Sequence, residues 1–313
     1  MDFEDRIKYY LGNLYNIFLN NEHIEYTDIF NEKEIIEFNR IQLINNNILF
    51  NDNYHHQIRY YIHDLRKYFN NSEIKNFNIY IALGDVHTKM NKYCFTRSRP
   101  TDLTDNFNIL LNLDTPVHWD CLNDVNNFDI PFDKKNNKII WRGTSTGYRG
   151  GDPSNIPRVN LVNKYQNHKN KNIDIKFSHL CQNVIDNNYI FNNLSRKEQL
   201  QSKFLISVEG NDVASNTEWV LYSNSVVIMS KPTMCSWSMQ DKLIPGIHYV
   251  EVKSDHSDLE EKYEWCLNNL EECKKIAENG KKFIEQFLDK EKEKKITNKI
   301  IEIYCKTIKF KLE

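Results

Sequence analysis

The sequence has no long apolar run, no strong charge of either sign and no paired-cysteine motif. No stretch of its 313 residues approaches the roughly 20 apolar residues that cross a membrane, and residues 1–6 lack the apolar core of a signal peptide. A net charge of −2 gives no general attraction to nucleic acid. The seven cysteines are odd in number and lack CxxC spacing, which favours reduced thiols. These absences predict a cytoplasmic protein with neither a membrane span nor a nucleic-acid partner.

Several catalytic signatures are also missing. No Asp-x-Asp pair occurs, so the sequence lacks the metal clamp of one large class of nucleotide-sugar enzymes. It contains no GxGxxG fingerprint, no Walker A motif, no GxSxG elbow and no HExxH pair. These absences set the corresponding chemistries aside.

The stretch over residues 203–252 has the most regular pattern. Short apolar runs over residues 204–208, 225–229 and 248–252 predict buried strands, and residues 213–222 predict a helix after the first of them. Strands that alternate with helices indicate a parallel sheet, whose ligands lie beyond the carboxyl ends of the strands. The loop after the first strand is therefore a predicted binding site, formed by Glu209, Gly210, Asn211, Asp212, Val213, Ala214, Ser215 and Asn216.

A second loop with binding chemistry follows the apolar run at residues 138–141. Arg142, Gly143 and Thr144 begin a loop of hydroxyls and glycines whose backbone N–H groups and guanidinium suit phosphate oxygens. A helix is predicted to begin at Pro157, which would direct Arg158 back to the same edge.

The first half of the chain is expected to be helical up to about residue 75, because its aromatic and aliphatic residues recur at helical spacing. These stripes, which include Ile35, Ile36, Phe38 and Ile41, are typical of a packed core. A strand over residues 77–83 then ends at Gly84 and Asp85. Asp85 either places a carboxylate at the functional edge of a sheet or caps the following turn.

The remaining segments are expected to connect and cover these strands. Residues 128–137 form the best linker candidate, because they combine Pro131 with a polar tract. Residues 257–260 read as a capping box that begins a helix, and the chain is predicted to end in a helix over residues 292–310. His248 is as compatible with a structural role as with a catalytic one.

Three ordered motifs resemble glycosyltransferase family 90, most closely its bacterial lipopolysaccharide-type branch. They are WRGTSTG followed by PRVNLV, then KFLISVEGNDVASNTEWVLYSNSVVIM, then PGIHYVEVKSDHSDLEEKYEWCLNN. The resemblance covers residues 138–290 strongly and residues 77–119 weakly. It implies a GT-B fold, in which two Rossmann-like α/β domains face a cleft. Residues 1–133 would form the acceptor-side domain, residues 134–291 the nucleotide-sugar-binding domain, and the helix at 292–313 would pack back on the first.

The resemblance also implies an inverting, metal-independent transfer of a hexose or pentose, glucose or xylose, from a UDP-sugar to a hydroxyl of a glycan or glycolipid. It thus implies no bound metal and no cofactor, and the missing Asp-x-Asp pair agrees with this expectation. Asp85 matches the acidic residue that serves as general base in the family. Thr144 and Arg158 match a hydroxyl and an arginine near the diphosphate, and residues 211–216 match the loop before the donor-binding helix.

One departure from the family pattern bears on the acceptor. The members that glucosylate proteins carry a phosphate-binding arginine where this chain has Asn216-Thr217. The cation for the leaving group is then expected from Arg142, Arg149 or Arg158. A protein hydroxyl as acceptor, a GT-B enzyme using another nucleotide, and a non-catalytic nucleotide- or glycan-binding relative remain open alternatives.

Overall fold

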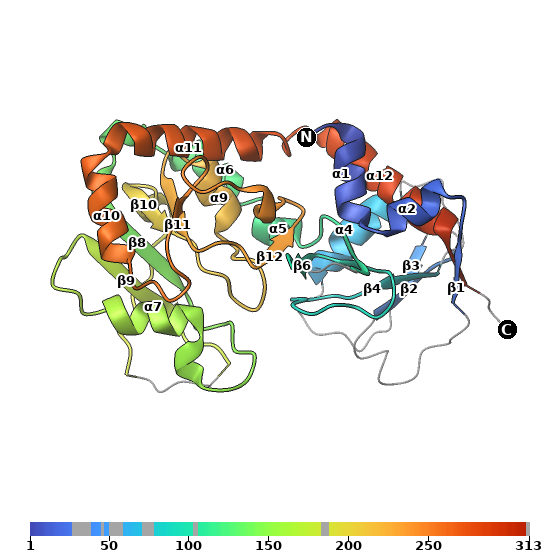
Figure 1. Cartoon of the computed structure of the whole chain (residues 1–313), viewed down its shortest axis with the longest axis horizontal. Helices are drawn as coiled ribbons and strands as arrows, with labels where there is room; N and C mark the ends of the chain where they lie inside the picture. The colour runs from blue at the N-terminus through green and yellow to red at the C-terminus, as the bar shows by residue number, and fades with distance from the viewer. Residues whose placement is uncertain are drawn as a thin grey trace. The chain divides into compact units, whose positions relative to one another are not determined.

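The computed structural model describes residues 1–26, 39–44, 47–49, 59–70, 78–102, 106–182 and 188–310. For residues 39–44 and 47–49 it describes the backbone alone. The chain divides into two compact units of mixed α/β structure (Figure 1). Unit 1 comprises Met1–Thr115, Cys235–Trp237 and Phe287–Glu313, and unit 2 comprises Pro116–Met234 and Ser238–Gln286. Each is described by itself below.

Unit 2 is built on a parallel five-stranded sheet in the order β13-β11-β10-β8-β9. Because all of these strands run in one direction, the loops that follow β8, β10 and β11 leave from the same edge of the sheet. The predicted parallel sheet is thus confirmed. Its strands are β8 (Asn136–Thr144), β9 (Ile173–His179), β10 (Ser202–Ile206), β11 (Val226–Met229) and β13 (Val250–Glu251).

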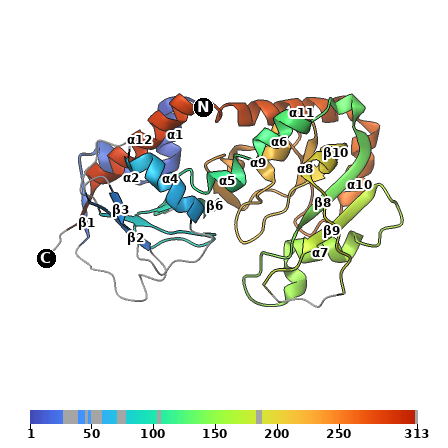
Figure 2. The ribbon, with the colours of Figure 1, turned by 180° about the vertical axis from the view of Figure 1, so that it is seen from behind.

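Helices cover both faces of this sheet. Ile139 and Trp141 of β8 pack in one core cluster with residues of α7 and α10, whereas Ile140 packs in a second cluster with residues of α6 and α9. This alternation is expected for a strand, whose successive side chains point to opposite faces. Figure 1 shows α7 and α10 on the near side, and Figure 2 shows α6, α8 and α9 from behind.

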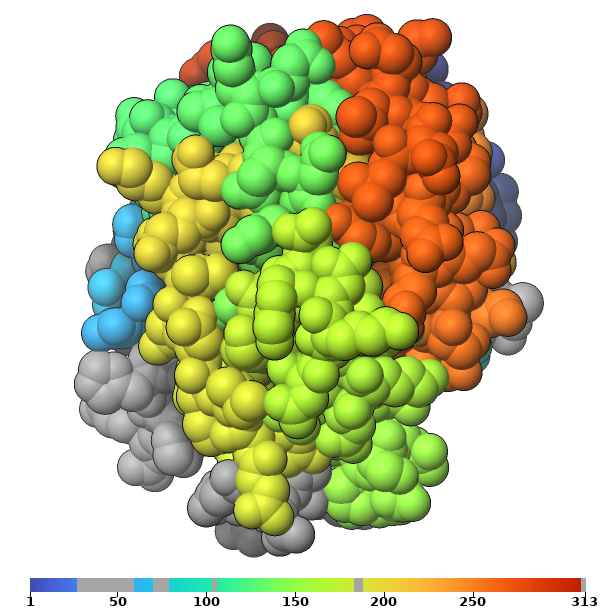
Figure 3. All heavy atoms as spheres, turned by 90° about the vertical axis from the view of Figure 1, so that its left-hand side faces the viewer, coloured from blue at the N-terminus to red at the C-terminus, as the bar shows by residue number. Residues whose placement is uncertain are grey.

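The helices of unit 2 vary widely in length. Figure 3 shows the face on which α10 and α11, in orange, lie beside the yellow-green chain from α7 to β9. The helices are α5 (Thr115–His118), which begins at the last residue of unit 1, α6 (Leu122–Phe128), α7 (Pro157–Tyr165), α8 (Arg196–Gln199), α9 (Thr217–Tyr222), α10 (Leu259–Asn268) and α11 (Leu270–Glu285), with short 3₁₀ turns η2 (Phe132–Lys134), η3 (Pro153–Asn155) and η4 (Gln240–Lys242).

Unit 1 contains a mixed sheet in the order β3-β2-β4-β5-β7, in which β4, β5 and β7 are parallel and β2 and β3 antiparallel. Two further pairs join distant parts of the chain, β1 with β14 and β6 with β12. The strands are β1 (Ile24–Tyr26), β2 (Asn39–Ile44), β3 (Asn47–Leu49), β4 (Asn78–Ile81), β5 (Cys94–Thr96), β6 (Ser98–Pro100), β7 (Asn108–Leu110), β12 (Met234–Ser236) and β14 (Ile308–Phe310).

The C-terminal helix α12 (Lys290–Thr307) packs on the N-terminal helices of unit 1. It contacts α1 (Phe3–Leu11), α2 (Leu14–Leu19) and α4 (Arg59–Asn70), and Figure 1 shows it in red beside the blue α1. Its buried face includes Ile296, Ile300 and Tyr304 at helical spacing. The two ends of the sequence are therefore assembled in one core.

Several predicted elements differ in the structure. Ile41, predicted helical, lies in β2, because backbone pairing with β3 and β4 outweighs the helical spacing. Ile35, Ile36 and Phe38 lie outside the described residues. The final helix ends at Thr307, and residues 308–310 pair with β1.

The predicted capping box at residues 257–260 is also wrong. The N-cap residue that precedes α10 is Asp258, whose carboxylate accepts a hydrogen bond from the Lys253 N–H instead of capping the helix. The Ser257 N–H likewise donates to the Asp255 carboxylate. Local bonds to the preceding turn therefore compete successfully with the cap.

Candidate functional site

The polar loops of unit 2 meet at the carboxyl edge of its sheet. β8, β10 and β11 are neighbours in the sheet, and they end at Thr144, Ile206 and Met229 respectively. The loops that follow them therefore start side by side. This arrangement brings together most of the site residues predicted from the sequence.

Arg158 ties two of these loops together. From the first turn of α7, its Nη2 lies 2.9 Å from the Val208 carbonyl oxygen and its Nε lies 3.2 Å from that of Glu209. Its Nη1 lies 2.8 Å from Thr146 Oγ1. The predicted placement of Arg158 at this edge is realised, and its guanidinium is engaged with backbone and hydroxyl oxygens of both loops.

Gly210 makes this close approach possible. A Cβ atom at this position would lie 2.8 Å from Thr146 Oγ1 and 3.0 Å from the guanidinium carbon of Arg158. Such distances are shorter than van der Waals contact, so any side chain at this position would have to displace the Thr146 hydroxyl and the Arg158 guanidinium. A Cβ on Gly147, which has a φ of +117°, would in turn lie 3.3 Å from the Gly210 carbonyl oxygen.

Asn211, in the loop after β10, holds this loop against the loop after β8 at the point where the two cross. Its Oδ1 accepts hydrogen bonds from the Gly147 N–H at 3.0 Å and from Gln182 Nε2 at 3.2 Å. Its backbone oxygen accepts from Nη2 of the exposed Arg149 at 3.1 Å. Gln182 belongs to this network although the sequence pattern gave no reason to select it.

Glu209 holds the loop that follows β11. Its carboxylate accepts from the backbone N–H groups of Thr233 and Met234 at 2.9 and 3.0 Å, and also from the Thr233 hydroxyl. Burial raises the pKa of this carboxyl above its ordinary value, although the bonds from Thr233 and Met234 oppose the shift. Glu209 therefore connects the loop after β10 to the loop after β11.

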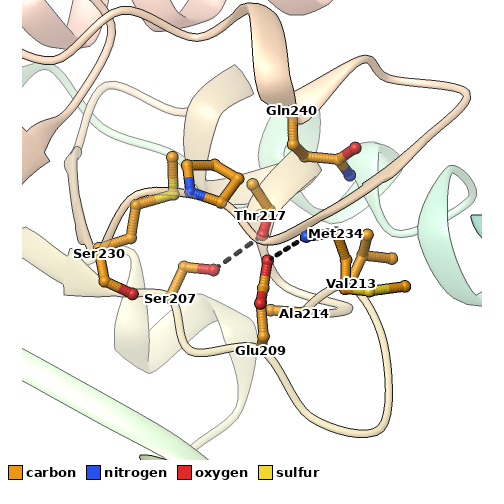
Figure 4. Close-up of a pocket in the computed structure, with 10 residues that line it drawn as sticks. Ser207, Glu209, Val213, Ala214, Thr217, Ser230, Met234 and Gln240 are labelled. Atoms are coloured by element: carbon orange, nitrogen blue, oxygen red, sulfur yellow. Dashed lines mark hydrogen bonds between the residues drawn. The ribbon is translucent and has the colours of Figure 1, made fainter. Parts of the chain in front are cut away.

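A small pocket that is partly open to solvent lies between these loops. In Figure 4, Glu209 and Ala214 lie on one side of it and Gln240 on the other. Apolar and polar groups both face the space, as is usual for small-molecule sites. Its lining consists of Ser207, Glu209, Val213, Ala214, Thr217, Met229, Ser230, Pro232, Met234 and Gln240.

Asn216 closes the loop against the end of β10. Its Nδ2 donates to the Ile206 carbonyl at 2.9 Å, and its Oδ1 accepts from the Ser207 hydroxyl at 3.1 Å. Ser207 Oγ also lies 2.7 Å from Thr217 Oγ1 at the start of α9. The predicted helix thus begins at Thr217 rather than at Val213, because the preceding residues form turns.

The remaining predicted donor-site residues lie in the same region, but their burial and contacts differ. Thr144 Oγ1 lies 3.1 Å from Thr146 Oγ1, in contact with the Arg158 network. Ser215 is exposed and Asp212 is buried. Gly143 packs beneath Trp141, since a Cβ atom there would lie 2.6 Å from the indole ring.

Arg142 points across the sheet. Its Nη2 lies 2.8 Å from Asp174 Oδ2 on β9, and its Nη1 lies 2.8 Å from the Asp174 carbonyl oxygen. Its Nε lies 3.3 Å from Asn192 Oδ1, so every nitrogen of the guanidinium takes part in a hydrogen bond. The structure therefore associates Arg142 with β9 and Asn192.

Asp85 lies in unit 1, after the carboxyl end of β4. Its Oδ1 accepts a hydrogen bond of 2.7 Å from Nη2 of the buried Arg97, and its side chain is 44% exposed. Nη1 of Arg97 lies 4.0 Å from Oδ2 of Asp114. The predicted base is thus an exposed carboxylate oriented by an arginine.

Sequence reasoning missed several pocket residues. Ser230, Pro232 and Met234 follow β11 directly, so the rule that ligands lie beyond strand ends could have found them. Gln240 carries no such signal, because its segment returns to the pocket only after β12.

Among the described residues, no group of His, Cys, Asp or Glu side chains is arranged to hold a metal ion. In the same part of the chain, no helix combines the length and apolarity of a membrane span.

Comparison with known proteins agrees with the motifs. The model of the family described as "Glycosyl transferase family 90" matches residues 118–313. The chain belongs to glycosyltransferase family 90. The resemblance inferred from the sequence motifs is confirmed. The matched region contains the parallel sheet, the loops at its carboxyl edge and the pocket of unit 2.

Individual relatives within and beyond bacteria are similar to parts of the chain. O-glucosyltransferase LpsA of Dichelobacter nodosus is 30% identical over 210 residues, which cover 67% of this chain and 61% of that protein. Uncharacterized protein 179R of Invertebrate iridescent virus 6 is 27% identical over 194 residues, covering 53% of this chain and 16% of that protein. Protein O-glucosyltransferase 2 of Danio rerio is 36% identical over 81 residues, covering 26% and 16%. The chain thus spans about three fifths of the bacterial relative and under a fifth of the other two.

Proposed function

We propose that this chain is an inverting, metal-independent glycosyltransferase that transfers glucose or xylose from a UDP-sugar to a hydroxyl of a glycan or glycolipid. Membership of family 90 and the similarity to a bacterial O-glucosyltransferase support the class of reaction. The observation that carries the proposal is the convergence of the β8 and β10 loops, joined by Arg158, beside a pocket at the carboxyl edge of a parallel sheet.

The donor would lie along this edge in unit 2, against Gly143, Thr144 and residues 209–216. All three guanidinium nitrogens of Arg142 and of Arg158 are engaged with oxygens of the protein, so we propose the exposed Arg149 as the cation for the diphosphate. Its guanidinium is exposed and is held by the Asn211 carbonyl next to the crossing loops. Backbone N–H groups of the glycine-containing loop would supply further donors.

The reaction needs a base and a stabilised leaving group. Asp85 would remove the proton of the acceptor hydroxyl as its oxygen attacks the anomeric carbon. The bond from that carbon to the UDP oxygen breaks, the configuration inverts, and UDP leaves with the electron pair. Positive charge and N–H donors at the diphosphate would stabilise the departing oxygen. Asp85 is supported by its exposure and by Arg97, which orients it.

A GT-B arrangement is part of the proposal. Residues 1–133, with the helix at 292–313, would form the acceptor-side domain, and residues 134–291 would bind the donor across a cleft. We also propose a cytoplasmic location, which is supported by the free thiol state of all seven cysteines, each within the described residues.

Ligand binding and turnover test the proposal separately. UDP should raise the melting temperature of the full chain more than GDP or ADP, because a ligand that binds only the folded state stabilises it. UDP-glucose or UDP-xylose should then release UDP in the presence of acceptor. Asp85→Asn should reduce turnover by about 10²–10⁴-fold with UDP affinity unchanged. Near-normal turnover in this variant would refute the base assignment, and stabilisation by GDP or ADP alone would refute the donor.

The acceptor class can be tested with the same enzyme. The similarity to Protein O-glucosyltransferase 2 of Danio rerio supports a polypeptide hydroxyl as the second candidate. Lipopolysaccharide-type glycans and serine-containing polypeptides should be offered in parallel with labelled UDP-glucose. Label transfer to the polypeptide alone would show that the acceptor is a polypeptide and not a glycan. UDP binding without UDP release from any donor would indicate a non-catalytic relative.

A further inference from the structure

A buried carboxylate lies behind the pocket of unit 2. Glu218, in the first turn of α9, is 1% exposed and does not line the pocket itself. Its Oε1 accepts hydrogen bonds from Ser238 Oγ at 2.8 Å and from Gln240 Nε2 at 2.9 Å. Its Oε2 lies 3.5 Å from Nδ1 of the buried His118. Glu218 thus contacts three polar side chains from two separate segments of unit 2.

The carboxylate is stabilised in its charged form. Burial alone raises the pKa of Glu218, but the nearby His118, together with the hydrogen bond from Ser238, holds it below its ordinary value. A buried charge is tolerated when polar partners surround it, and removing one partner is costly. Such a group fixes the orientation of the side chains that donate to it.

The backbone between the two donors is strained. Met239, which separates Ser238 from Gln240, has φ 57° and ψ 50°. This left-handed conformation is unfavourable for a residue with a side chain and persists only where surrounding contacts hold it. Both neighbours of Met239 donate to the same oxygen of Glu218. The carboxylate therefore holds the turn that directs Gln240 to the pocket.

Gln240 lines the pocket opposite Glu209 (Figure 4). Its position depends on a left-handed turn and on a hydrogen bond to a residue outside the pocket. We propose that Glu218 is a positioning residue for donor binding: it holds Gln240 in place to contact the sugar nucleotide. This inference rests on the proposed function, since it takes the pocket as part of the UDP-sugar site.

A double-mutant cycle on the full chain tests the relationship. UDP and UDP-glucose binding should be measured by calorimetry for the wild type, Glu218→Gln, Gln240→Ala and the double variant. Gln240→Ala should weaken UDP-glucose binding about tenfold, as expected for loss of a buried hydrogen bond. Glu218→Gln should weaken it about fivefold alone and leave the double variant no weaker than Gln240→Ala, because its effect passes through Gln240. In turnover, the KM for the donor should rise while kcat stays within about twofold of the wild type.

Ser223→Ala serves as a matched control for general destabilisation. Ser223 is buried at the end of the same helix, and its hydroxyl donates to the Val220 carbonyl away from the pocket lining. It should lower the melting temperature without changing the KM. If Glu218→Gln does not fold, Ser238→Ala replaces it, because this change removes one donor to the same oxygen.

The outcomes separate this inference from the proposed function. Additive effects of Glu218→Gln and Gln240→Ala, or unchanged binding in Glu218→Gln, would overturn the positioning role while leaving the donor site standing. A wild-type protein that binds neither UDP nor UDP-glucose would overturn both. A raised KM in Ser223→Ala equal to that of Glu218→Gln would show that the effect is loss of stability, which also overturns the role.

Discussion

Arg97 donates a hydrogen bond of 2.7 Å to Oδ1 of Asp85, and its second terminal nitrogen lies 4.0 Å from Oδ2 of Asp114. The arginine is 5% exposed, whereas the aspartate beside it is 44% exposed. The buried guanidinium therefore orients a carboxylate that solvent reaches. A planar guanidinium fixes the orientation of a carboxylate better than the single ammonium group of lysine does.

Arg97→Lys should accordingly impair the base without affecting the donor site. We expect kcat to fall about tenfold, because one ammonium group cannot maintain the geometry toward both carboxylates. UDP affinity, measured by calorimetry, should not change, since Arg97 belongs to unit 1. Arg66→Lys, a change at an exposed residue of α4, is the control. Unaltered kcat in Arg97→Lys would contradict the orienting role.

Gly210→Ala should disrupt the crossing of the β8 and β10 loops. The new methyl group would lie within 3.0 Å of Thr146 and Arg158, which must then separate. UDP affinity should fall at least about tenfold, since the loss of two or three donor contacts exceeds 1.4 kcal/mol. Gly246→Ala provides the control, because its φ of +75° disfavours alanine but its Cβ would meet no atom within 4 Å. It should cost about 1 kcal/mol of stability and leave UDP binding intact. Wild-type affinity in Gly210→Ala would place the diphosphate elsewhere.

Arg149→Ala tests the cation proposed for the diphosphate. Loss of a charged hydrogen bond should weaken UDP binding about 10–100-fold, whereas uridine, which has no phosphate, should bind as before. The difference in UDP affinity between Arg149→Ala and the wild type should shrink at high salt, because the contact is exposed and electrostatic. Lys171→Ala removes an exposed positive charge elsewhere in unit 2 and serves as the control. Equal loss of UDP and uridine binding would mean that Arg149 does not contact phosphate.

The sequence was informative wherever an apolar run ended at a distinctive loop. The runs before Glu209 and Arg142 identified adjacent strands of a parallel sheet, and Pro157 correctly marked the helix that carries Arg158. Side-chain direction was less predictable. Nothing local distinguishes Arg142, which binds Asp174 on the next strand, from Arg158, which binds the loops.

Other features depend on contacts that no short window contains. Glu218 and Gln240 are 22 residues apart and meet through a left-handed turn at Met239, which has no periodic signature. The C-terminal strand β14 exists because β1 supplies a partner from the other end of the chain. The strand β2 likewise forms through pairing and not through propensity.

The buried ion pair of unit 1 should contribute strongly to its stability. Arg6 is fully buried and donates to both carboxylate oxygens of Glu293 on α12, at 2.5 and 2.8 Å. Trp237 also donates to this carboxylate, at 2.6 Å. Arg6→Met should lower the free energy of unfolding of unit 1 by about 3–5 kcal/mol, because it leaves a mostly buried charge without its partner. Urea denaturation should show this loss, with Arg66→Met close to the wild type; equal midpoints for both variants would contradict it.

The stability of unit 2 should fall at acidic pH because of His256. This side chain is 1% exposed, and neither ring nitrogen has a hydrogen-bond partner among the described residues. Burial, aided by the charge of Lys164, lowers its pKa from 6.5 to about 4, while Asp255 and Asp258 oppose the shift. Above pH 6.5 both the folded and the unfolded state carry a neutral ring. Between pH 6.5 and 4 only the unfolded state binds the proton, so the folded state loses stability as the pH falls, by on the order of 3 kcal/mol in total.

His256→Asn should remove this dependence. Asparagine tolerates the left-handed backbone at this position, where φ is 58°, and it does not titrate in this range. The midpoint of urea denaturation should therefore fall less steeply from pH 6.5 to 4 in this variant than in the wild type. His23→Asn, at an exposed histidine of unit 1, is the control and should follow the pH dependence of the wild type. If His256→Asn and the wild type lost stability in parallel, the acid sensitivity would belong to the carboxylates instead.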